Sequence, residues 1–342
     1  MSKAGTRVSS AKDERPRPYG DDWRFKPVKD QSFTQKMILF HGMLAKSPRQ
    51  FKYPLPKGKV PVHSLLASQL QILPYAVVPI FARWAYMKYT GNTVNPLVLL
   101  GCATLYNVFF LVSFITRINK YGEKYGYLDG EAGRDTITEA MTGKLFLEMM
   151  NAVVVRPLLM ISLAYDRNVM PNISPWVLFQ VFLFSVVLDF WYYWFHRASH
   201  EVESLWQYHR RHHTTKHPSA YLAGFADGVQ EVFDAVVAPA LAYLTFPVSY
   251  DTLYIWSMYL IAVEVGGHSG LRMFYASPST AIFLRPFNLE LVIEDHDLHH
   301  RFGWKHSENY GKQTRVWDSW FGTNGERLET SYNQVDWKDV IY

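Results

Sequence analysis

The sequence has 342 residues but only one cysteine, Cys102, which lies inside an apolar run. An intrachain disulfide and a cluster of thiolate ligands are therefore excluded, and any bound metal must use nitrogen or oxygen ligands. The first twenty residues are basic, but no apolar core follows them, so we expect no cleaved secretory signal. The HExxH pattern of zinc hydrolases is also missing from the sequence.

The chain lacks a Gly-rich basic and aromatic motif of the kind that binds RNA, although its net charge is +5. Much of the positive charge lies close to apolar stretches, as at Arg117, Lys120 and Lys124. We therefore assign the excess to a membrane surface. The expected partner is the lipid bilayer, and we expect no nucleic acid.

Long apolar stretches are abundant, and hydrophobic residues make up 49% of the chain. About 20 apolar residues cross the hydrocarbon core of a bilayer. Residues 65–87 and 94–115 therefore predict a transmembrane hairpin. Residues 176–195 predict a further span in which Asp189 is the only charge.

Three other apolar stretches are interrupted. Residues 145–165 contain two charges and a proline, which favours an interfacial or kinked helix. Residues 232–248 and 253–265 predict either a second hairpin or two half-inserted helices. No segment shows the alternation typical of strands, so helices are expected throughout.

The predicted fold class is all-α: an integral membrane helical bundle with a histidine-lined helical cap. The positive-inside bias places the cap in the cytosol, because basic residues surround the histidines. The expected domains are a polar, Pro-rich cytosolic arm (1–60), N-terminal transmembrane and interfacial helices (61–175), the histidine-bearing domain (176–323) and a C-terminal tail (324–342).

Ten of the thirteen histidines fall between residues 196 and 300. On a helix, side chains at i, i+3 and i+4 lie on one face, so each group would point its rings to one side. The groups are His196 with His200, His209 with His212 and His213, and His296 with His299 and His300.

Three helices of this kind offer eight imidazoles to a common centre, and His268 would make nine because nearby glycines allow close approach of the backbone. A single zinc needs about four ligands, so this number suits two metal ions. Imidazole accepts iron, zinc, copper or nickel. We favour iron, because a site at the ends of membrane helices suits oxidation of an unactivated carbon by O2. The role of His217, which precedes a proline, stays open.

Carboxylates near the histidines are candidates for orienting them, because a ligating imidazole usually donates its other ring N–H to an acceptor. Asp189 lies two helical turns before His196 on the same face, and an ionisable group inside a span is a functional candidate. We therefore predict a supporting catalytic role for it. Weaker candidates are Asp227, Glu264, Glu294, Asp295 and Asp297.

The three histidine groups resemble, in order, the HxxxH, HxxHH and HxxHH motifs of the fatty acid hydroxylase and sterol desaturase superfamily. The similarity extends to Asn309-Tyr310-Gly311, Trp317-Asp318 and Phe321-Gly322-Thr323, and it covers about residues 176–323. This resemblance implies a diiron domain, O2 as oxidant, and electrons from cytochrome b5 or a similar donor. It also implies the endoplasmic reticulum as location.

Two features refine what the resemblance implies. His268 looks like the extra ligand of the superfamily, but its usual partner four residues earlier is Glu264 here, which leaves one ligand set open. The chain contains no His-Pro-Gly-Gly haem motif, so its electron donor would be a separate protein.

The sequence thus predicts a membrane-bound diiron oxygenase that hydroxylates a lipid-like substrate. A desaturase or sterol methyl oxidase of the same superfamily is an alternative. A non-catalytic metal-binding or transport protein is the alternative from another class.

Overall fold

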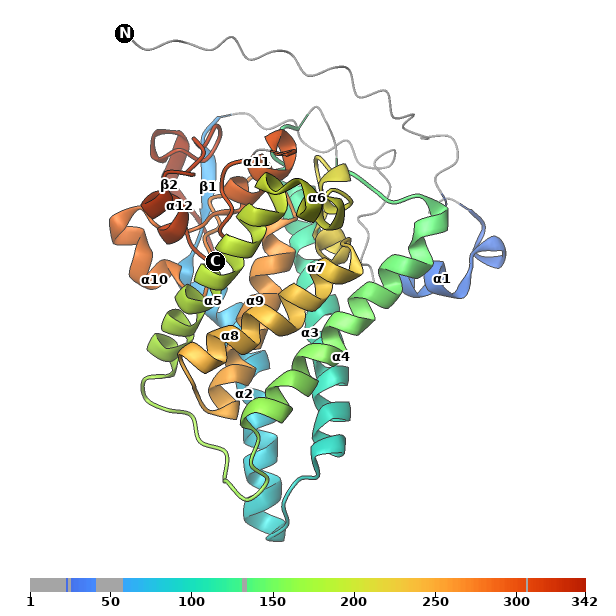
Figure 1. The fold of residues 1–342 in the computed structure, drawn as a ribbon, viewed down its shortest axis with the longest axis vertical. Helices are drawn as coiled ribbons and strands as arrows, with labels where there is room; N and C mark the ends of the chain where they lie inside the picture. The colour runs from blue at the N-terminus through green and yellow to red at the C-terminus, as the bar shows by residue number, and fades with distance from the viewer. Residues whose placement is uncertain (1–22, 24–25, 41–57, 131–133, 306) are drawn as a thin grey trace.

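A computed structural model describes residues 23, 26–40, 58–130, 134–305 and 307–342. In this part of the chain, long helices form a bundle and short helices gather at one end of it (Figure 1). The prediction of a helical bundle is confirmed. Its long helices bury one side against their neighbours and expose many apolar side chains on the other, as expected of a protein that sits in a bilayer.

The described residues include four helices that are long and apolar enough to cross a membrane. They comprise the three predicted spans and one more, for which the sequence favoured an interfacial or kinked helix. The helices are α2 (Leu65–Thr90), α3 (Pro96–Tyr125), α4 (Thr142–Ala164, preceded by a 3-10 turn at Glu139–Met141) and α5 (Val177–Glu201).

The charges that argued against a span in α4 are paired inside the protein. Glu148 accepts a hydrogen bond from Arg211 at 2.7 Å, and Arg156 donates one to Glu264 at 2.6 Å. Because each charge has an opposite partner away from lipid, neither prevents the helix from lying in the membrane.

The turn between α2 and α3 follows from its capping residues. Gly91 ends α2 with a φ of 71°, in the left-handed region that favours glycine. The side chain of Asn95 accepts a hydrogen bond from the N–H of Leu97 at 2.8 Å and so starts α3. The two helices form the predicted hairpin, whose turn lies at the bottom of Figure 1.

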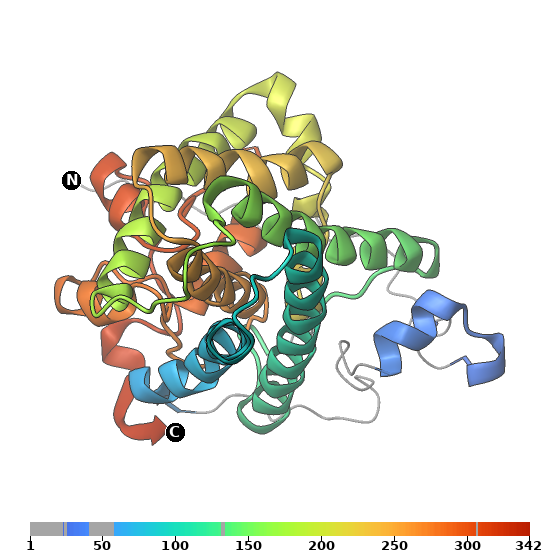
Figure 2. The same cartoon turned by 90° about the horizontal axis from the view of Figure 1, so that it is seen from below.

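Helix α9 (Tyr250–Gly267) occupies the centre of the bundle. It packs against α2, α3, α4 and α5 (Figure 2). Nearly all of its side chains are buried. The expected second hairpin is therefore not what forms. The preceding apolar stretch instead forms three joined pieces: α7 (Gly228–Val232), a π-helical turn (Phe233–Val237) that packs against α4, and α8 (Ala238–Thr245), which packs against α5.

The end of the bundle opposite the α2–α3 turn carries a cap of short helices, drawn at the top and left of Figure 1. Its main elements are α6 (Glu203–His209), the 3-10 turns η4 (His212–Thr214) and η5 (Ala220–Gly224), α10 (Ala281–Leu284), the 3-10 turn η7 (Arg285–Phe287), α11 (Ile293–Phe302) and α12 (Val316–Phe321).

A short parallel sheet corrects the expectation of helices alone. Strand β1 (Val60–His63) pairs with β2 (Val335–Ile341), which follows the 3-10 turn Tyr332–Gln334. The strands are 4 and 7 residues long and were too short to show a clear alternation. The pairing joins the residues before the first span to the C-terminal tail, so that tail packs onto the cap.

The described part of the polar arm also packs on the bundle. It contains a 3-10 turn at Val28–Asp30 and helix α1 (Phe33–Phe40). The indole of Trp23 is buried and donates a hydrogen bond to the carbonyl of Ile137 at 3.1 Å. Over this stretch the arm is therefore ordered against the start of α4, and residues 1–22 lie outside the described part.

Candidate metal centre

The nine predicted histidines meet inside the cap in two groups. Within each group, one ring nitrogen of every residue lies within 4.8 Å of the others, and all nine side chains are buried. The five-histidine group is His196, His200, His209, His213 and His299, and the four-histidine group is His212, His268, His296 and His300.

Helix geometry explains the first and third histidine motifs. His196 and His200 lie one turn apart near the end of α5, and His296, His299 and His300 lie on α11. The prediction of one helix for the middle motif is wrong, because α6 ends at His209 and the chain tightens into the turn η4. This turn sends His212 and His213 into different groups.

Most of these imidazoles donate their Nδ1 proton to an oxygen that can only accept. Six of these acceptors are backbone carbonyls, of Tyr310, Trp304, Phe225, Glu264, Glu308 and Thr215. Another is the side-chain oxygen of Gln230, 2.9 Å from Nδ1 of His209. Each such bond places the ring proton on Nδ1 and leaves a lone pair on Nε2.

These lone pairs point at one another. Nε2 of His196 lies 3.0 Å from Nε2 of His209, and Nε2 of His212 lies 3.2 Å from that of His268. Two lone pairs at this distance repel and form no hydrogen bond, unless a cation or a proton lies between them. The geometry therefore fits a pair of metal ions held by neutral nitrogens.

Burial favours the neutral form that binds a metal. Loss of water, reinforced by the neighbouring imidazoles, lowers the pKa of His209, His212 and His213 well below the usual value. These rings are uncharged at neutral pH, so no proton has to leave before a metal binds.

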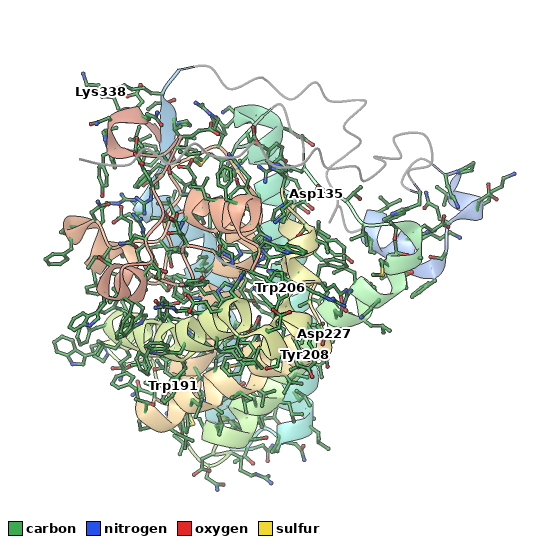
Figure 3. All side chains as sticks on the ribbon, turned by 45° about the horizontal axis from the view of Figure 1, so that its top comes forward. Asp135, Trp191, Trp206, Tyr208, Asp227 and Lys338 are labelled. Carbon is green, nitrogen blue, oxygen red and sulfur yellow. The ribbon has the colours of Figure 1, made fainter. Side chains whose placement is uncertain are left out.

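Trp206 on α6, labelled in Figure 3, packs against two imidazoles of the five-histidine group. Its ring centroid lies 5.3 Å from that of His200 and 6.0 Å from that of His213, and it packs edge-on against Trp304 at 4.8 Å. The indole is 5% exposed. Such an aromatic cover excludes water from the imidazoles and lowers the local dielectric.

Asp189 supports the site in a way that the sequence did not reveal. Its carboxylate accepts hydrogen bonds from the N–H groups of Lys312, Gln313 and Thr314 at 2.6 to 3.0 Å, and from the Thr314 hydroxyl at 2.7 Å. The carbonyl of the nearby Tyr310 accepts the Nδ1 proton of His196. Asp189 thus fixes the loop that orients a histidine, and it does not itself accept a proton from an imidazole.

The weaker carboxylate candidates are structural. Glu294 accepts from the N–H groups of residues 328–330, and Asp295 pairs with Arg327 at 2.8 Å. Asp297 pairs with Arg134 at 2.6 Å, and Asp227 caps α7. Glu294, Asp295 and Asp297 are buried, and these contacts occupy their carboxylates in place of a histidine ring.

Glu264, whose position raised a question about the ligand set, is engaged elsewhere. Its carboxylate lies 2.6 Å from both Arg156 and Lys312. Its carbonyl, not its side chain, holds the ring of His268. The four-histidine group is therefore assembled without this carboxylate.

Two further histidines that the structure describes lie outside both groups. His217 lies 3.7 Å from the carboxylate of Asp129, and His63 of β1 is buried between Ser68 and Gln71. His41 and His306 lie outside the described residues. Gln230 is the side chain that sequence reasoning missed, because no motif connects it with His209, 21 residues earlier.

A cavity of about 80 Å³ borders the four-histidine group. His212 and His268 line one side of it, and apolar residues of α3, α4 and α9, such as Val153 and Ile261, line another. Arg156, Lys312, Glu264 and Asp234 place paired charges on its wall. The cavity therefore has an apolar part of its wall and, beside the imidazoles, a polar part.

Comparison with known proteins gives a consistent picture. A family model described as fatty acid hydroxylase matches residues 181–323, which include all nine histidines. The chain is 38% identical over 305 residues to the fatty acid hydroxylase vlmA of Lecanicillium sp, covering 83% of this chain and 79% of that protein.

Two other relatives match about half of their own length. A very-long-chain aldehyde decarbonylase, GL1-8 of Oryza sativa subsp. indica, is 32% identical, with 45% of this chain and 55% of that protein covered. A methylsterol monooxygenase, erg25B of Aspergillus fumigatus, is 30% identical, with 43% of this chain and 49% of that protein covered. No solved structure matches the chain.

Proposed function

This chain belongs to the fatty acid hydroxylase family, and on that premise we propose that it is a diiron hydroxylase of a lipid-like substrate. Relatives named as hydroxylases and monooxygenases support an oxygen-dependent, lipid-modifying oxidoreductase. The balanced reaction is R–H + O2 + 2 e⁻ + 2 H⁺ → R–OH + H2O. The identity of R is not specified by the family.

The proposal rests on one observation: within each of the two groups, the Nε2 lone pairs of two histidines face each other at a short distance. We assign the five-histidine group to one iron and the four-histidine group to the other. Bound iron would supply the activation of O2 and the one-electron chemistry that protein side chains lack. The donor set fits this role because imidazole binds iron and both groups consist of histidines alone.

The chain itself positions the imidazoles and keeps water away from them. The carbonyls of Tyr310 and Phe225 and the amide of Gln230 hold the imidazoles in one tautomer. Trp206 and Trp304 limit the entry of water. The cavity beside His212 and His268 is our candidate for the place where the substrate carbon reaches the site, since its apolar wall leads to the four-histidine group.

We further propose that the site faces the cytosol at the endoplasmic reticulum and receives electrons from cytochrome b5 or a similar carrier. The basic residues toward the end of α3, Arg117, Lys120 and Lys124, support this orientation. The segment that follows α3 contacts α11 through the ion pair of Arg134 with Asp297 at 2.6 Å, so this end of α3 lies at the histidine end. Basic loops favour the cytosolic side.

The test is metal analysis and turnover of the full chain purified in mild detergent. Two iron ions per chain and O2-dependent hydroxylation of a lipid, with electrons from reduced cytochrome b5, are expected from the two groups. Zinc in place of iron with no oxidised product would contradict the proposal and favour a non-catalytic metal protein. An unsaturated product would identify a desaturase instead. Comparing lipid extracts of cells with and without the protein selects the substrates to try.

A further inference from the structure

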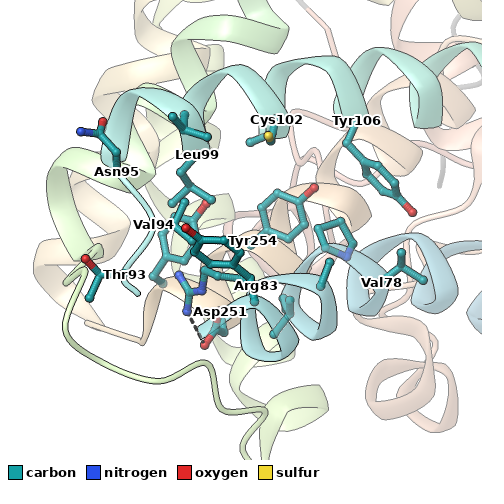
Figure 4. A pocket seen from close by; sticks show the side chains of 17 residues that line it. Val78, Arg83, Thr93, Val94, Asn95, Leu99, Cys102, Tyr106, Asp251 and Tyr254 are labelled. Carbon is teal, nitrogen blue, oxygen red and sulfur yellow. Dashed lines mark hydrogen bonds and ion pairs between the residues drawn. The ribbon is translucent and has the colours of Figure 1, made fainter. Parts of the chain in front are cut away.

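A cavity between the transmembrane helices lies far from the histidines. It has a volume of about 550 Å³ and is bounded by α2, the turn into α3, the first half of α3 and the start of α9 (Figure 4). Its wall residue Tyr254 and the metal-site residue His268 are 14 positions apart along α9. At 1.5 Å per residue they are separated by about 20 Å, so this cavity is distinct from the metal centre.

Most of the cavity wall is apolar. Val78, Val98, Leu99 and Ala103 belong to it, and the single cysteine, Cys102, also lines it and is accessible. A volume of this size falls in the range of small-molecule sites, which are mostly apolar with a few polar groups that orient the ligand. The wall suits an alkyl chain or a fused ring system.

Polar groups in the cavity have hydrogen-bonding capacity that the described residues do not use. Arg83 is 7% exposed, and one of its terminal nitrogens binds Asp251 at 2.9 Å. Its Nε and Nη1 are buried and meet no acceptor in the described part, and the same is true of the hydroxyls of Tyr250 and Tyr254. All three side chains line the cavity.

Buried polar groups are costly unless they are hydrogen-bonded. Arg83 has only N–H groups to offer, so a ligand must present an acceptor oxygen to it. The carboxylate of Asp251 already neutralises the guanidinium, and it would repel an anionic headgroup placed beside it. The chemistry of the wall therefore selects a neutral oxygen function over a carboxylate or phosphate.

We propose that this cavity binds a neutral lipid with one hydroxyl or carbonyl oxygen, such as a long-chain alcohol, held by Arg83, Tyr250 and Tyr254. The apolar part lies between α2 and α3, open to the lipid-facing side where Val78 and Val98 are exposed. This is a second lipid site, independent of the identity of the substrate at the metal centre.

Cys102 provides a direct readout, because it is the only thiol in the chain. The full chain in mixed micelles is treated with N-ethylmaleimide, and the alkylation rate is followed by mass spectrometry. Hexadecanol is expected to slow alkylation saturably, at least about threefold, whereas hexadecane and, at pH 8, hexadecanoate do not. Equal slowing by hexadecane would show simple partition of lipid and overturn the proposal.

Two variants on different helices test the assignment further. Val78→Trp fills the cavity from α2 and should remove the effect of hexadecanol, while Leu70→Trp, exposed on the same helix but not lining the cavity, should keep it. Tyr254→Phe removes one hydroxyl and should weaken the binding of hexadecanol about threefold to tenfold. Metal content reports that each variant is folded. Unchanged protection in both Val78→Trp and Tyr254→Phe would overturn the proposal.

Discussion

The Nε2 atoms of His212 and His268 lie 3.2 Å apart, although both residues donate their Nδ1 protons to backbone carbonyls. The carbonyls of Phe225 and Glu264 thereby fix both tautomers, and two lone pairs face each other in a buried site. The positions of the two rings are set by the elements that carry them, η4 and the end of α9. A cation between the rings would turn the repulsion into ligation, which leads to the first prediction.

Removing one histidine from each group should remove different metal ions. We expect His209→Ala and His212→Ala each to lower the iron content by about one ion per chain and to abolish turnover, because each loses a ligand of a different group. Metal analysis and O2 consumption measure both effects.

His217→Ala is the matched control for these variants. His217 belongs to the same segment but to neither group, so this variant should keep both ions and its activity. Loss of iron in this control equal to that of His209→Ala would show that the ligand assignment is wrong.

Gln230 should strengthen metal binding by holding the ring of His209 in place. Gln230→Leu removes the acceptor of the Nδ1 proton and frees the ring to turn, and losses of this kind typically cost 10- to 100-fold in metal affinity. Gln230→Glu keeps an acceptor and should retain affinity. Competition with a chelator provides the measurement.

Gln207→Leu on the exposed side of α6 should leave metal affinity unchanged, since its side chain bonds only to the carbonyl of Ser204 among the described residues. If Gln230→Leu and Gln207→Leu bind iron equally well, Gln230 has no part in holding His209.

Asp189→Asn should destabilise the fold and disturb His196. The amide can no longer accept all four hydrogen bonds from residues 312–314, and we expect a loss of about 3 kcal/mol in the free energy of unfolding. Thermal unfolding in detergent, together with iron content, checks this.

The control for Asp189→Asn is Glu201→Gln at the exposed end of α5, where Glu201 pairs with Arg197 at 3.0 Å. An exposed pair contributes about 1 kcal/mol or less. Equal losses in the two variants would mean that Asp189 does not organise the loop.

His63 should make stability depend on pH. Burial lowers its pKa from 6.5 to about 4, and Arg117 contributes in the same direction. The unfolded chain therefore binds a proton that the folded chain excludes between these values, so stability falls as pH drops from about 6.5 to 4.

His63→Gln lacks this titration. Over that pH window the wild type should lose up to about 3 kcal/mol more than the variant. Chemical unfolding at several pH values gives the comparison, and parallel curves would show that His63 is not held neutral by the fold.

The sequence by itself predicted the nine histidines that meet in the two groups, because spacings of three and four put the imidazoles of α5 and α11 on single faces. It also indicated the α2–α3 hairpin and the α5 span, since apolar length alone decides whether a helix can cross a bilayer. The charges of α4 misled the prediction, because their partners Arg211 and Glu264 are distant in sequence.

Only the tertiary structure decided how the nine histidines divide. Residues His212 and His213 are neighbours in sequence, yet the turn η4 directs them to different groups. Only the tertiary structure also showed which carbonyls fix the imidazole tautomers together with Gln230, which loop Asp189 holds, and that hydrogen-bond donors line the cavity at Arg83. Each depends on contacts between segments far apart in the chain, and local spacing contains no information about which segments meet.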